Sequence, residues 1–97
     1  MSETLRLDLF LFYARFLKSR SLAAELCRDE RVRLSGRVIE KAAALVRVGD
    51  VLTFPQGNRI RVIRVLTLPS RRGPAAEAQA CFEDLAPLAS PAAERQE

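Results

Sequence analysis

RLDLFLFYARFLKSRSLAAELCRDERVRLSG, residues 6–36, is the stretch that decides the fold of this 97-residue chain. It contains two short helical patterns joined by a basic corner, and then a strand pattern with arginine at every second position. The densest positive charge of the chain lies at the corner and along that strand. A compact element with an apolar back and a cationic front is suited to binding a phosphate backbone.

The first helical pattern, residues 7–17, is apolar on almost every side and is interrupted by Asp8 and Arg15. Asp8 is a suitable N-cap for a helix that continues to about Phe16. A helix of this composition has to be buried on most sides, as it is when it packs between a sheet and a second helix. The two charges lie two turns apart on one face. Arg15 either has a structural role, in which it pairs with Asp8 or solvates the exposed stripe of the helix, or it helps to bind an anion.

The basic corner consists of residues 18–21 (KSRS). Ser19 is the expected N-cap of a second helix that runs from Arg20 to about Asp29. Lys18 and Arg20 flank the N-terminus of this helix, where basic side chains oppose the macrodipole. An anion bound at this end would explain them, and the alternative is a solvated charged turn. The apolar face of the helix is formed by Leu22, Ala23, Leu26 and Cys27.

A strand is expected at residues 31–34 because basic and apolar side chains alternate there. Val32 and Leu34 then face the core, and a turn at residues 35–36 (SG) leads into a second extended segment. Such alternation is found in any half-buried strand, so its functional interest comes from the neighbouring corner. The cations of this region are Arg31, Arg33, Arg37 and Lys41.

The middle of the chain predicts a β-hairpin. A Gly-Asp turn at residues 49–50 precedes a strand over residues 51–54, and a turn at residues 55–58 (PQGN) joins it to a strand over residues 59–68. Within the second strand, the alternation of apolar and basic residues shifts by one position. A β-bulge near residues 62–63 would restore the order of inward and outward side chains.

The last part of the chain begins with a loop at residues 69–74 (PSRRGP), in which Pro74 is placed to open a helix. The apolar spacing that follows predicts a helix over residues 75–85. From residue 87 onward the chain is rich in Pro, Ala and Glu, so residues 87–97 are expected to form a disordered tail.

The net charge of +4 conceals an asymmetry between the two ends of the chain. Residues 1–72 carry 15 basic and 7 acidic side chains, a balance of +8, and residues 73–97 carry 1 basic and 5 acidic side chains, a balance of −4. A basic body with an acidic tail fits a polyanion that contacts the body alone. The chain has 14 Arg and 2 Lys, and either phosphate binding or a base-composition bias of the genome explains this excess of arginine.

Several kinds of site and location are disfavoured by the composition. No apolar run approaches the roughly 20 residues that span a bilayer, and the N-terminus does not resemble a signal peptide, so a cytoplasmic protein is expected. The chain has no His, and Cys27 and Cys81 are isolated from each other, which argues against a zinc site and favours core positions for both. We expect no metal and no cofactor.

Five short motifs, taken in order, resemble the S4-type RNA-binding domain. They are Arg6-Leu7-Asp8, Ala14-Arg15-Phe16, Lys18-Ser19-Arg20 with Ala23, Val32-x-Leu34-Ser35-Gly36, and Gly49-Asp50. The resemblance covers about residues 5–54, and its specificity comes from the joint occurrence of motifs that are weak one by one. It implies an α+β fold with two N-terminal helices packed on a small, mainly antiparallel sheet, to which we add a short C-terminal helix. It also implies binding of structured RNA through the helix corner and the adjoining strand.

Residues 56–58 (QGN) and 71–78 (RRGPAAEA) resemble the bacterial heat shock protein 15 family, whose members are stand-alone S4 proteins associated with the large ribosomal subunit. This resemblance implies binding to free large subunits that still carry a nascent chain on tRNA, in rescue of stalled translation. The chain departs from the family pattern at Glu30, where Gly is usual, and at Ser35, where Asn is usual. Its tail is short and acidic, where the family often has a longer basic extension.

The resemblance implies an RNA-binding domain over residues 1–68, with the loop and helix of residues 69–86 packed on it. The expected partners are rRNA, tRNA and the large ribosomal subunit, with no membrane and no small-molecule substrate, and we expect a monomer. Carried over by position, the RNA-contacting candidates are Arg6, Arg15, Lys18, Ser19, Arg20, Arg31, Arg33, Arg37 and Lys41.

Two alternatives differ in the class of function. An enzyme is disfavoured because the sequence shows no nucleophile and base at a recognisable spacing and no glycine-rich phosphate loop, so we expect no catalytic residue. Two further hypotheses remain open. The chain could be a structured-RNA-binding module without a ribosomal role, or it could be a protein-interaction adaptor that uses residues 75–85 or the outer side of residues 7–17. An adaptor would be recognised by tight binding that does not depend on salt.

Overall fold

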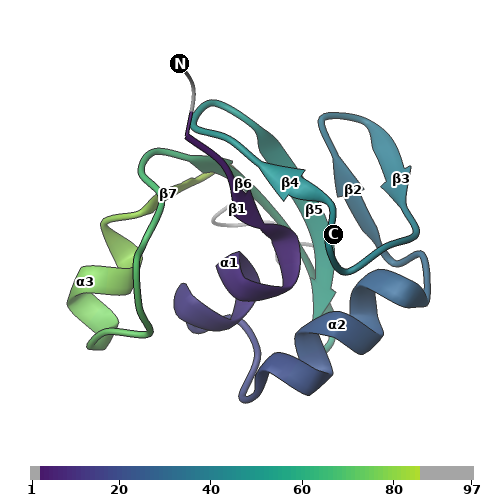
Figure 1. Ribbon diagram of the computed structural model, residues 1–97, viewed down its shortest axis with the longest axis horizontal. Helices are drawn as coiled ribbons and strands as arrows, with labels where there is room; N and C mark the ends of the chain where they lie inside the picture. Colours follow the sequence, from purple (N-terminus) through teal and green to yellow (C-terminus); the bar gives the residue numbers. More distant parts are fainter. Residues whose placement is uncertain (1–2, 86–97) are drawn as a thin grey trace, which may run out of the picture.

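The computed structural model describes residues 3–85, which form an α+β fold with helices packed on antiparallel sheet (Figure 1). This confirms the fold class expected from the sequence. In chain order, the elements are β1 (Leu5–Arg6), α1 (Leu7–Tyr13), α2 (Arg20–Arg28), β2 (Val32–Leu34), β3 (Arg37–Ile39), β4 (Leu45–Val46), β5 (Val51–Gln56), β6 (Arg59–Val65), α3 (Ala75–Gln79) and β7 (Phe82–Asp84).

The main sheet has five strands in the order β3-β2-β5-β6-β7, and every neighbouring pair is antiparallel. The helices α1 and α2 lie in front of this sheet, the β2–β3 hairpin forms one edge, and α3 lies beside the opposite edge (Figure 1). A separate two-stranded pair joins β1 to β4 and holds the start of α1 against the middle of the chain. The N–H of Leu7 also donates to the Ala44 carbonyl at 2.7 Å.

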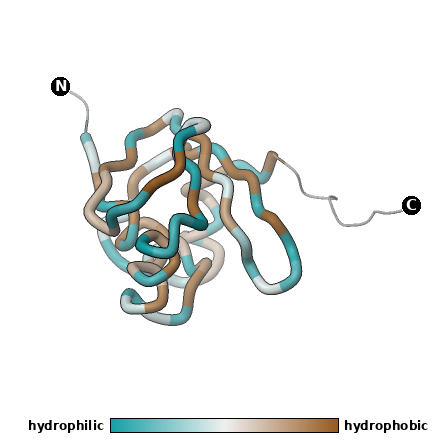
Figure 2. The backbone as a smooth tube through the Cα atoms, turned by 90° about the vertical axis from the view of Figure 1, so that its right-hand side faces the viewer, coloured by the Kyte–Doolittle hydropathy of each residue, from teal (hydrophilic) through white to brown (hydrophobic). Residues whose placement is uncertain are grey.

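The core lies between the two long helices and the inner face of the sheet. Apolar and polar segments alternate along the strands (Figure 2), because successive side chains of a strand point to opposite faces. Both cysteines are buried, as expected, and burial raises the pKa of the Cys27 thiol to about 11, which keeps it protonated at neutral pH. The side chains with no exposed surface are Leu7, Phe10, Leu11, Ala23, Cys27, Val32, Val46, Leu52, Ile63 and Val65.

The first helix is shorter than the sequence predicts, and its cap was assigned wrongly. It begins at Leu7 with Arg6 at the N-cap position, so Asp8 lies inside the first turn. It ends at Tyr13, because Arg15 adopts a left-handed conformation with φ of 68°. This reversal turns the aromatic ring of Phe16 back into the core, which an uninterrupted helix would not do.

The second helix matches its prediction closely, with one change in its buried face. Ser19 is the N-cap, as expected, and its hydroxyl accepts a hydrogen bond from the Leu22 N–H at 3.1 Å. The Leu22 side chain is exposed, however, and Ala24 takes its place in the core. Small side chains on this face allow α2 to lie close against α1.

The predicted β-bulge in the second hairpin strand is wrong. The pairing of β5 with β6 is continuous from Val51↔Arg64 to Gln56↔Arg59, and its tight turn consists of residues 57–58 alone. Arg61 therefore points to the inner side of the sheet, and Ile60 is left exposed on the outer side. The inner side accepts Arg61 because its guanidinium stacks on an aromatic ring and pairs with a carboxylate, as described below.

The predicted helix over residues 75–85 is confirmed only in its first half. Pro74 is the N-cap of α3, but the helix ends at Gln79, and Phe82–Asp84 forms β7 along the free edge of β6. The apolar spacing suited a helix, yet pairing with β6 supplies backbone hydrogen bonds that local sequence does not reveal. The tail expected at residues 87–97 lies outside the described residues.

Candidate RNA-binding surface

The basic corner presents a helix N-terminus to solvent between two cations. Ser19 is extended and caps one N–H of α2, and the remaining N–H groups of the first turn point out of the helix end. Lys18 and Arg20, on either side of Ser19, are both exposed. The local sequence therefore produces an end of positive potential that is open to an anion.

A buried carboxylate holds two arginines next to this end. Asp8 is 2% exposed, and it accepts hydrogen bonds from Arg6 at 3.1 Å to each carboxylate oxygen and from Arg20 Nε at 3.4 Å. The N–H of Leu9 adds a fourth bond at 2.8 Å. The side chains of Arg6 and Arg20 keep 42% and 50% of their surface exposed. We refer to Arg6, Asp8 and Arg20 as the Asp8 cluster.

Asp8 is ionised, and the Asp8 cluster still carries a net positive charge because two arginines surround the one carboxylate. Burial acts to raise the pKa of this carboxyl, but hydrogen bonds and charge from Arg6, with bonds from Arg20 and the Leu9 N–H, outweigh burial and lower it. Two guanidinium groups around one carboxylate leave a net positive charge. Their outer edges can donate to a phosphate while their inner edges are fixed by Asp8.

Arg28 was not among the candidates predicted from the sequence, but it lies next to the Asp8 cluster. A hollow of about 350 Å³ is lined by Arg6, Asp8, Arg20 and Arg28, together with Ser21, Ala24 and Glu25. Arg20 and Arg28 lie eight residues apart in α2, so they share one face of the helix. The spacing of Arg20 and Arg28 is visible in the sequence, but only the fold places Arg6 in the same hollow.

Arg15 does not join the Asp8 cluster, so the alternative in which it pairs with Asp8 is not observed. Because α1 ends before Arg15, the two residues are not on one helix face. Instead, Arg15 Nη1 donates to the carbonyl of Gly73 at 2.8 Å and so contacts the loop that precedes α3. Its side chain is exposed at the opposite end of α1 from the cluster.

The strand cations divide between the two sides of the β2–β3 hairpin. Arg33 lies opposite Val38 and Thr53, on the face of the sheet that the helices do not cover. Arg37 lies opposite Leu34, so it points to the helix side. The exposed cations of this region are Arg31, Arg33, Arg37 and Lys41, and no ion pair is recorded for them among residues 3–85.

The two departures from the family pattern lie at backbone positions that favour glycine or asparagine. Glu30 adopts φ of 61° directly after α2, and Ser35 adopts φ of 50° in the β2–β3 turn. Ser35 compensates by donating its hydroxyl to Asp50 at 3.3 Å. Asp50 also accepts the Arg47 N–H at 2.8 Å, so the Gly-Asp motif has a structural role beneath this turn.

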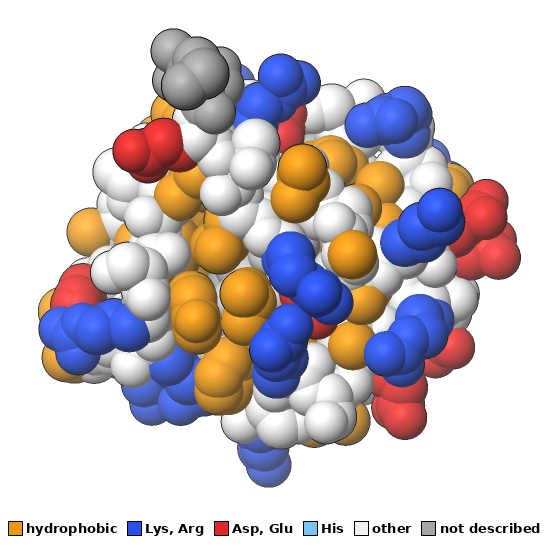
Figure 3. Space-filling model, in the orientation of Figure 1, with side chains coloured by type: hydrophobic (Ala, Val, Ile, Leu, Met, Phe, Trp, Pro, Cys, Tyr) orange, Lys and Arg blue, Asp and Glu red, His pale blue; other side chains and the backbone are white. Residues whose placement is uncertain are grey.

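The space-filling view shows how the charges are distributed on the helix side. Blue side chains gather at the centre, over the start of α1 and α2, and along the right-hand side near α2, β2 and β3 (Figure 3). Acidic side chains are interspersed at that right-hand edge (Figure 3). On this side the basic side chains thus form separate groups, with hydrophobic and acidic side chains between and beside them (Figure 3).

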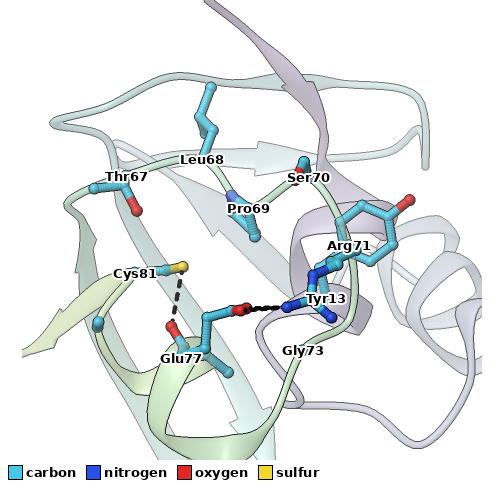
Figure 4. A pocket seen from close by; sticks show the side chains of 11 residues that line it. Tyr13, Thr67, Leu68, Pro69, Ser70, Arg71, Gly73, Glu77 and Cys81 are labelled. Atoms are coloured by element: carbon cyan, nitrogen blue, oxygen red, sulfur yellow. Dashed lines mark hydrogen bonds and ion pairs between the residues drawn. The ribbon is translucent and has the colours of Figure 1, made fainter.

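A second cavity in the described residues differs from the Asp8 cluster in its charge. A cavity of about 400 Å³ lies between Tyr13, the 67–73 loop and α3, and its charged members Arg71 and Glu77 pair with each other at 2.9 Å (Figure 4). Within residues 3–85, no group of three or more His, Cys, Asp or Glu side chains could hold a metal. None of the helices in that range is both long and apolar enough to cross a membrane.

Comparison with known proteins places this geometry in a family. An S4 domain matches residues 5–52. The solved trimeric structure of Vibrio cholerae heat shock protein 15 superposes with a TM-score of 0.81 at 33% identity, covering 87% of this chain and 84% of that one. The chain belongs to the heat shock protein 15 family of S4-domain proteins.

Two further relatives show how far the sequence match extends. Heat shock protein 15 of Escherichia coli K12 is 37% identical over 81 residues, which is 84% of this chain and 60% of that protein. The RQC P-site tRNA stabilizing factor of Halalkalibacterium halodurans is 36% identical over 61 residues, covering 63% of this chain and 68% of that factor. The chain thus spans less than two thirds of the length of E. coli heat shock protein 15.

Proposed function

We propose that this S4 protein binds RNA on the large ribosomal subunit and acts in the rescue of stalled subunits that carry a nascent chain on tRNA. The observation that carries the proposal is the Asp8 cluster, in which buried Asp8 presents Arg6 and Arg20 beside Lys18 at the N-terminus of α2. Fixed guanidinium forks and a free helix end are the groups that bind phosphate oxygens.

The proposed contact begins at the helix corner and extends around the molecule. Lys18, Ser19, the Asp8 cluster and Arg28 form its centre, and the cations of the β2–β3 region lie at its border. Arg15 would contribute at the other side of the corner. Phosphate and sugar contacts of this kind read the shape of folded RNA rather than its base sequence.

The ribosomal part of the proposal rests on the relatives. RQC P-site tRNA stabilizing factors of two further bacteria, Streptococcus pneumoniae and Bacillus subtilis, are 28% and 36% identical to this chain over 64 and 61 residues, which are 66% and 63% of its length. Their shared name states that these factors stabilise tRNA in the P site. We propose a binding role without catalysis, in the cytoplasm, with rRNA and tRNA as the RNA partners.

The division of labour along the chain is also proposed. Residues 1–68 would form the RNA-binding domain and residues 69–86 would support it. The monomer expected from the sequence stays a prediction, and the solved relative from V. cholerae is described as trimeric. Light scattering of the purified protein at the concentration used for RNA binding would establish its oligomeric state.

Sedimentation tests the ribosomal role. Purified large subunits, with and without P-site peptidyl-tRNA, would be mixed with the protein at low and raised salt and centrifuged through sucrose. We expect co-sedimentation that is stronger with tRNA-carrying subunits and decreases as salt rises. A protein that stays at the top of the gradient but still retards folded RNA in a gel would instead be a general S4 module, and our ribosomal proposal would be wrong.

A further inference from the structure

Residues 14–19 form the α1–α2 connection, which has no regular secondary structure and leads into the proposed RNA-binding corner. Within the connection, the Arg15 N–H donates to the Phe12 carbonyl and the Phe16 N–H to the Leu11 carbonyl, both at 3.0 Å. Arg15 adopts a left-handed backbone conformation, which is unfavourable for any residue with a Cβ atom. Such a segment keeps one shape only where its surroundings hold it.

Arg72 holds the connection from the loop that precedes α3. Its Nε donates to the Phe12 carbonyl at 3.2 Å and its Nη2 to the Leu17 carbonyl at 3.5 Å. Its guanidinium carbon also lies 4.9 Å from the centre of the Phe12 ring. The Arg72 side chain therefore binds the backbone on both sides of the reversal, and its second contact, Leu17, directly precedes Lys18.

Gln56 holds the connection from the sheet. Its Nε2 donates to the Phe16 carbonyl at 3.0 Å, and its Oε1 accepts from Arg61 Nη1 at 2.7 Å. Arg61 in turn pairs with Asp84 at 3.1 Å and stacks 5.2 Å from the centre of the Phe16 ring. The amide is thereby fixed in the orientation that offers its donor to the connection.

The contact with the 70–73 loop is reciprocal. Arg15 of the connection donates to the Gly73 carbonyl, while Arg72 of the loop donates to the Leu17 carbonyl of the connection. Gln56, Arg61, Arg72 and Gly73 all lie beyond residue 52, where the S4 match ends.

We propose that Gln56 and Arg72 are positioning residues that hold the α1–α2 connection in the shape that presents Lys18, Ser19 and Arg20 to RNA. This rests on the proposed RNA-binding function. Neither residue needs to touch RNA, because Gln56 acts through the Phe16 carbonyl and Arg72 through the carbonyls of Phe12 and Leu17. Residues outside the matched S4 segment would then set the affinity of the S4 surface by pre-organising it.

The test combines two readouts on matched pairs of variants. Gln56→Ala is compared with Gln79→Ala. Gln79 is an exposed glutamine on α3, and the described residues show no hydrogen bond from it to the connection. Arg72→Ala is compared with Arg71→Ala, which also removes one positive charge. Arg71 pairs with Glu77 on α3 and not with the connection (Figure 4). The first readout is amide hydrogen exchange of Arg15 and Phe16 in the free protein, and the second is the salt dependence of RNA affinity.

We expect Gln56→Ala and Arg72→Ala to speed exchange of the two amides by about fivefold or more and to weaken RNA binding by a similar factor. Gln56→Ala should leave the slope of log affinity against log salt unchanged, because no phosphate contact is lost. Gln79→Ala should change neither readout, and Arg71→Ala should leave the exchange rates unchanged.

Gln56→Glu guards against simple misfolding. The carboxylate keeps an acceptor for Arg61 and the size of the side chain, but it has no donor for the Phe16 carbonyl, so exchange at Phe16 should still accelerate. Unchanged exchange in all three variants would overturn the positioning role, and so would faster exchange with unaltered RNA affinity. Failure of the unmodified chain to bind any RNA would overturn the proposed function instead, and the exchange rates would still report on the tethers.

Discussion

At the scale of single residues, Asp8 links the stability of the fold to the display of its positive charge. It is buried, ionised and shared by Arg6 and Arg20, which lie 2 and 12 residues away in sequence. The arginines lose rotamer freedom to Asp8 before any RNA arrives, which lowers the cost of ordering them on binding. The same carboxylate also limits the surface, because it cancels part of their charge.

Asp8 makes a prediction about pH. The pKa of Asp8 is depressed in the folded state, so the folded protein binds fewer protons than the unfolded one at acidic pH. The stabilising effect of Asp8 is therefore present above the ordinary pKa of 3.8. That contribution should disappear as pH falls through the folded pKa. We expect Asp8→Asn to lower the free energy of unfolding at neutral pH by about 1–3 kcal/mol. Urea denaturation at several pH values measures both effects.

The acid dependence of Asp8→Asn should be weaker than that of the unmodified chain. Glu83→Gln is the control, because Glu83 is half-exposed and pairs with Arg64 on the outer side of the sheet. It should have little effect on stability at neutral pH. Equal acid dependence in the unmodified chain and in Asp8→Asn would show that Asp8 is not the group that couples folding to pH.

Glu30 makes a prediction in which strain and charge can be separated. It combines a left-handed backbone with an acidic side chain next to Arg31. Glu30→Gly should stabilise the fold by up to about 1 kcal/mol, since strain relief exceeds the added freedom of the unfolded chain. It should also tighten RNA binding by removing a negative charge from the border of the surface.

Glu30→Gln provides the comparison, because it removes the charge but keeps a side chain at the strained position. We expect it to tighten RNA binding as Glu30→Gly does, without the gain in stability. Thermal unfolding and RNA titration of both variants check the two parts. If Glu30→Gln bound RNA more weakly than the unmodified chain, the border of the contact would lie elsewhere.

At the scale of elements, the N-terminus of α2 joins folding and function in one residue. Ser19→Ala should lower the free energy of unfolding by about 1 kcal/mol, since the Leu22 N–H loses its acceptor. Ser21→Ala, two residues along the same helix, should cost nothing because alanine favours helix. Denaturant titration compares the two, and equal losses would contradict the capping role of Ser19.

How well each element could be predicted depended on how local its determinants are. The cap at Ser19, the helix that follows, the strand with buried Val32 and Leu34, and the Ser35 turn all rest on neighbouring residues. The strand at residues 82–84 rests on pairing with β6, some twenty residues earlier, and local spacing suggested a helix instead. The apparent shift of alternation in β6 had no bulge behind it, because Arg61 finds partners on the inner side.

The candidate site shows the same limit. The sequence singled out Lys18, Ser19 and Arg20 from their clustering. It did not reveal that Asp8 binds Arg6 and Arg20, that Arg28 joins them, or that Arg15 turns toward Gly73. These relations arise from the reversal after Tyr13, which the apolar pattern of α1 concealed. The contact between Gln56 and the Phe16 carbonyl spans 40 residues and was equally beyond local reasoning.

At the scale of the whole molecule, the charges distinguish the two sides of the sheet. The helix side presents the Asp8 cluster and the basic corner, whereas the uncovered outer side carries Arg33 and the Arg64–Glu83 pair among apolar side chains such as Ile60. One RNA surface would therefore lie on the helix side and reach the outer side only around the β2–β3 edge. Arg33→Ala should accordingly weaken RNA binding less than Lys18→Ala, as measured by titration at fixed salt.

The most direct test of the account is the salt dependence of RNA affinity for the unmodified chain, Lys18→Ala, Arg28→Ala and the outer-side control Arg64→Ala. Each phosphate contact on duplex RNA contributes close to one unit to the slope of log affinity against log salt. We expect Lys18→Ala and Arg28→Ala each to bind more weakly and to lower the slope by about one unit, with Arg64→Ala unchanged. Unaltered slopes and affinities in both helix-side variants would contradict a phosphate-binding surface at this corner.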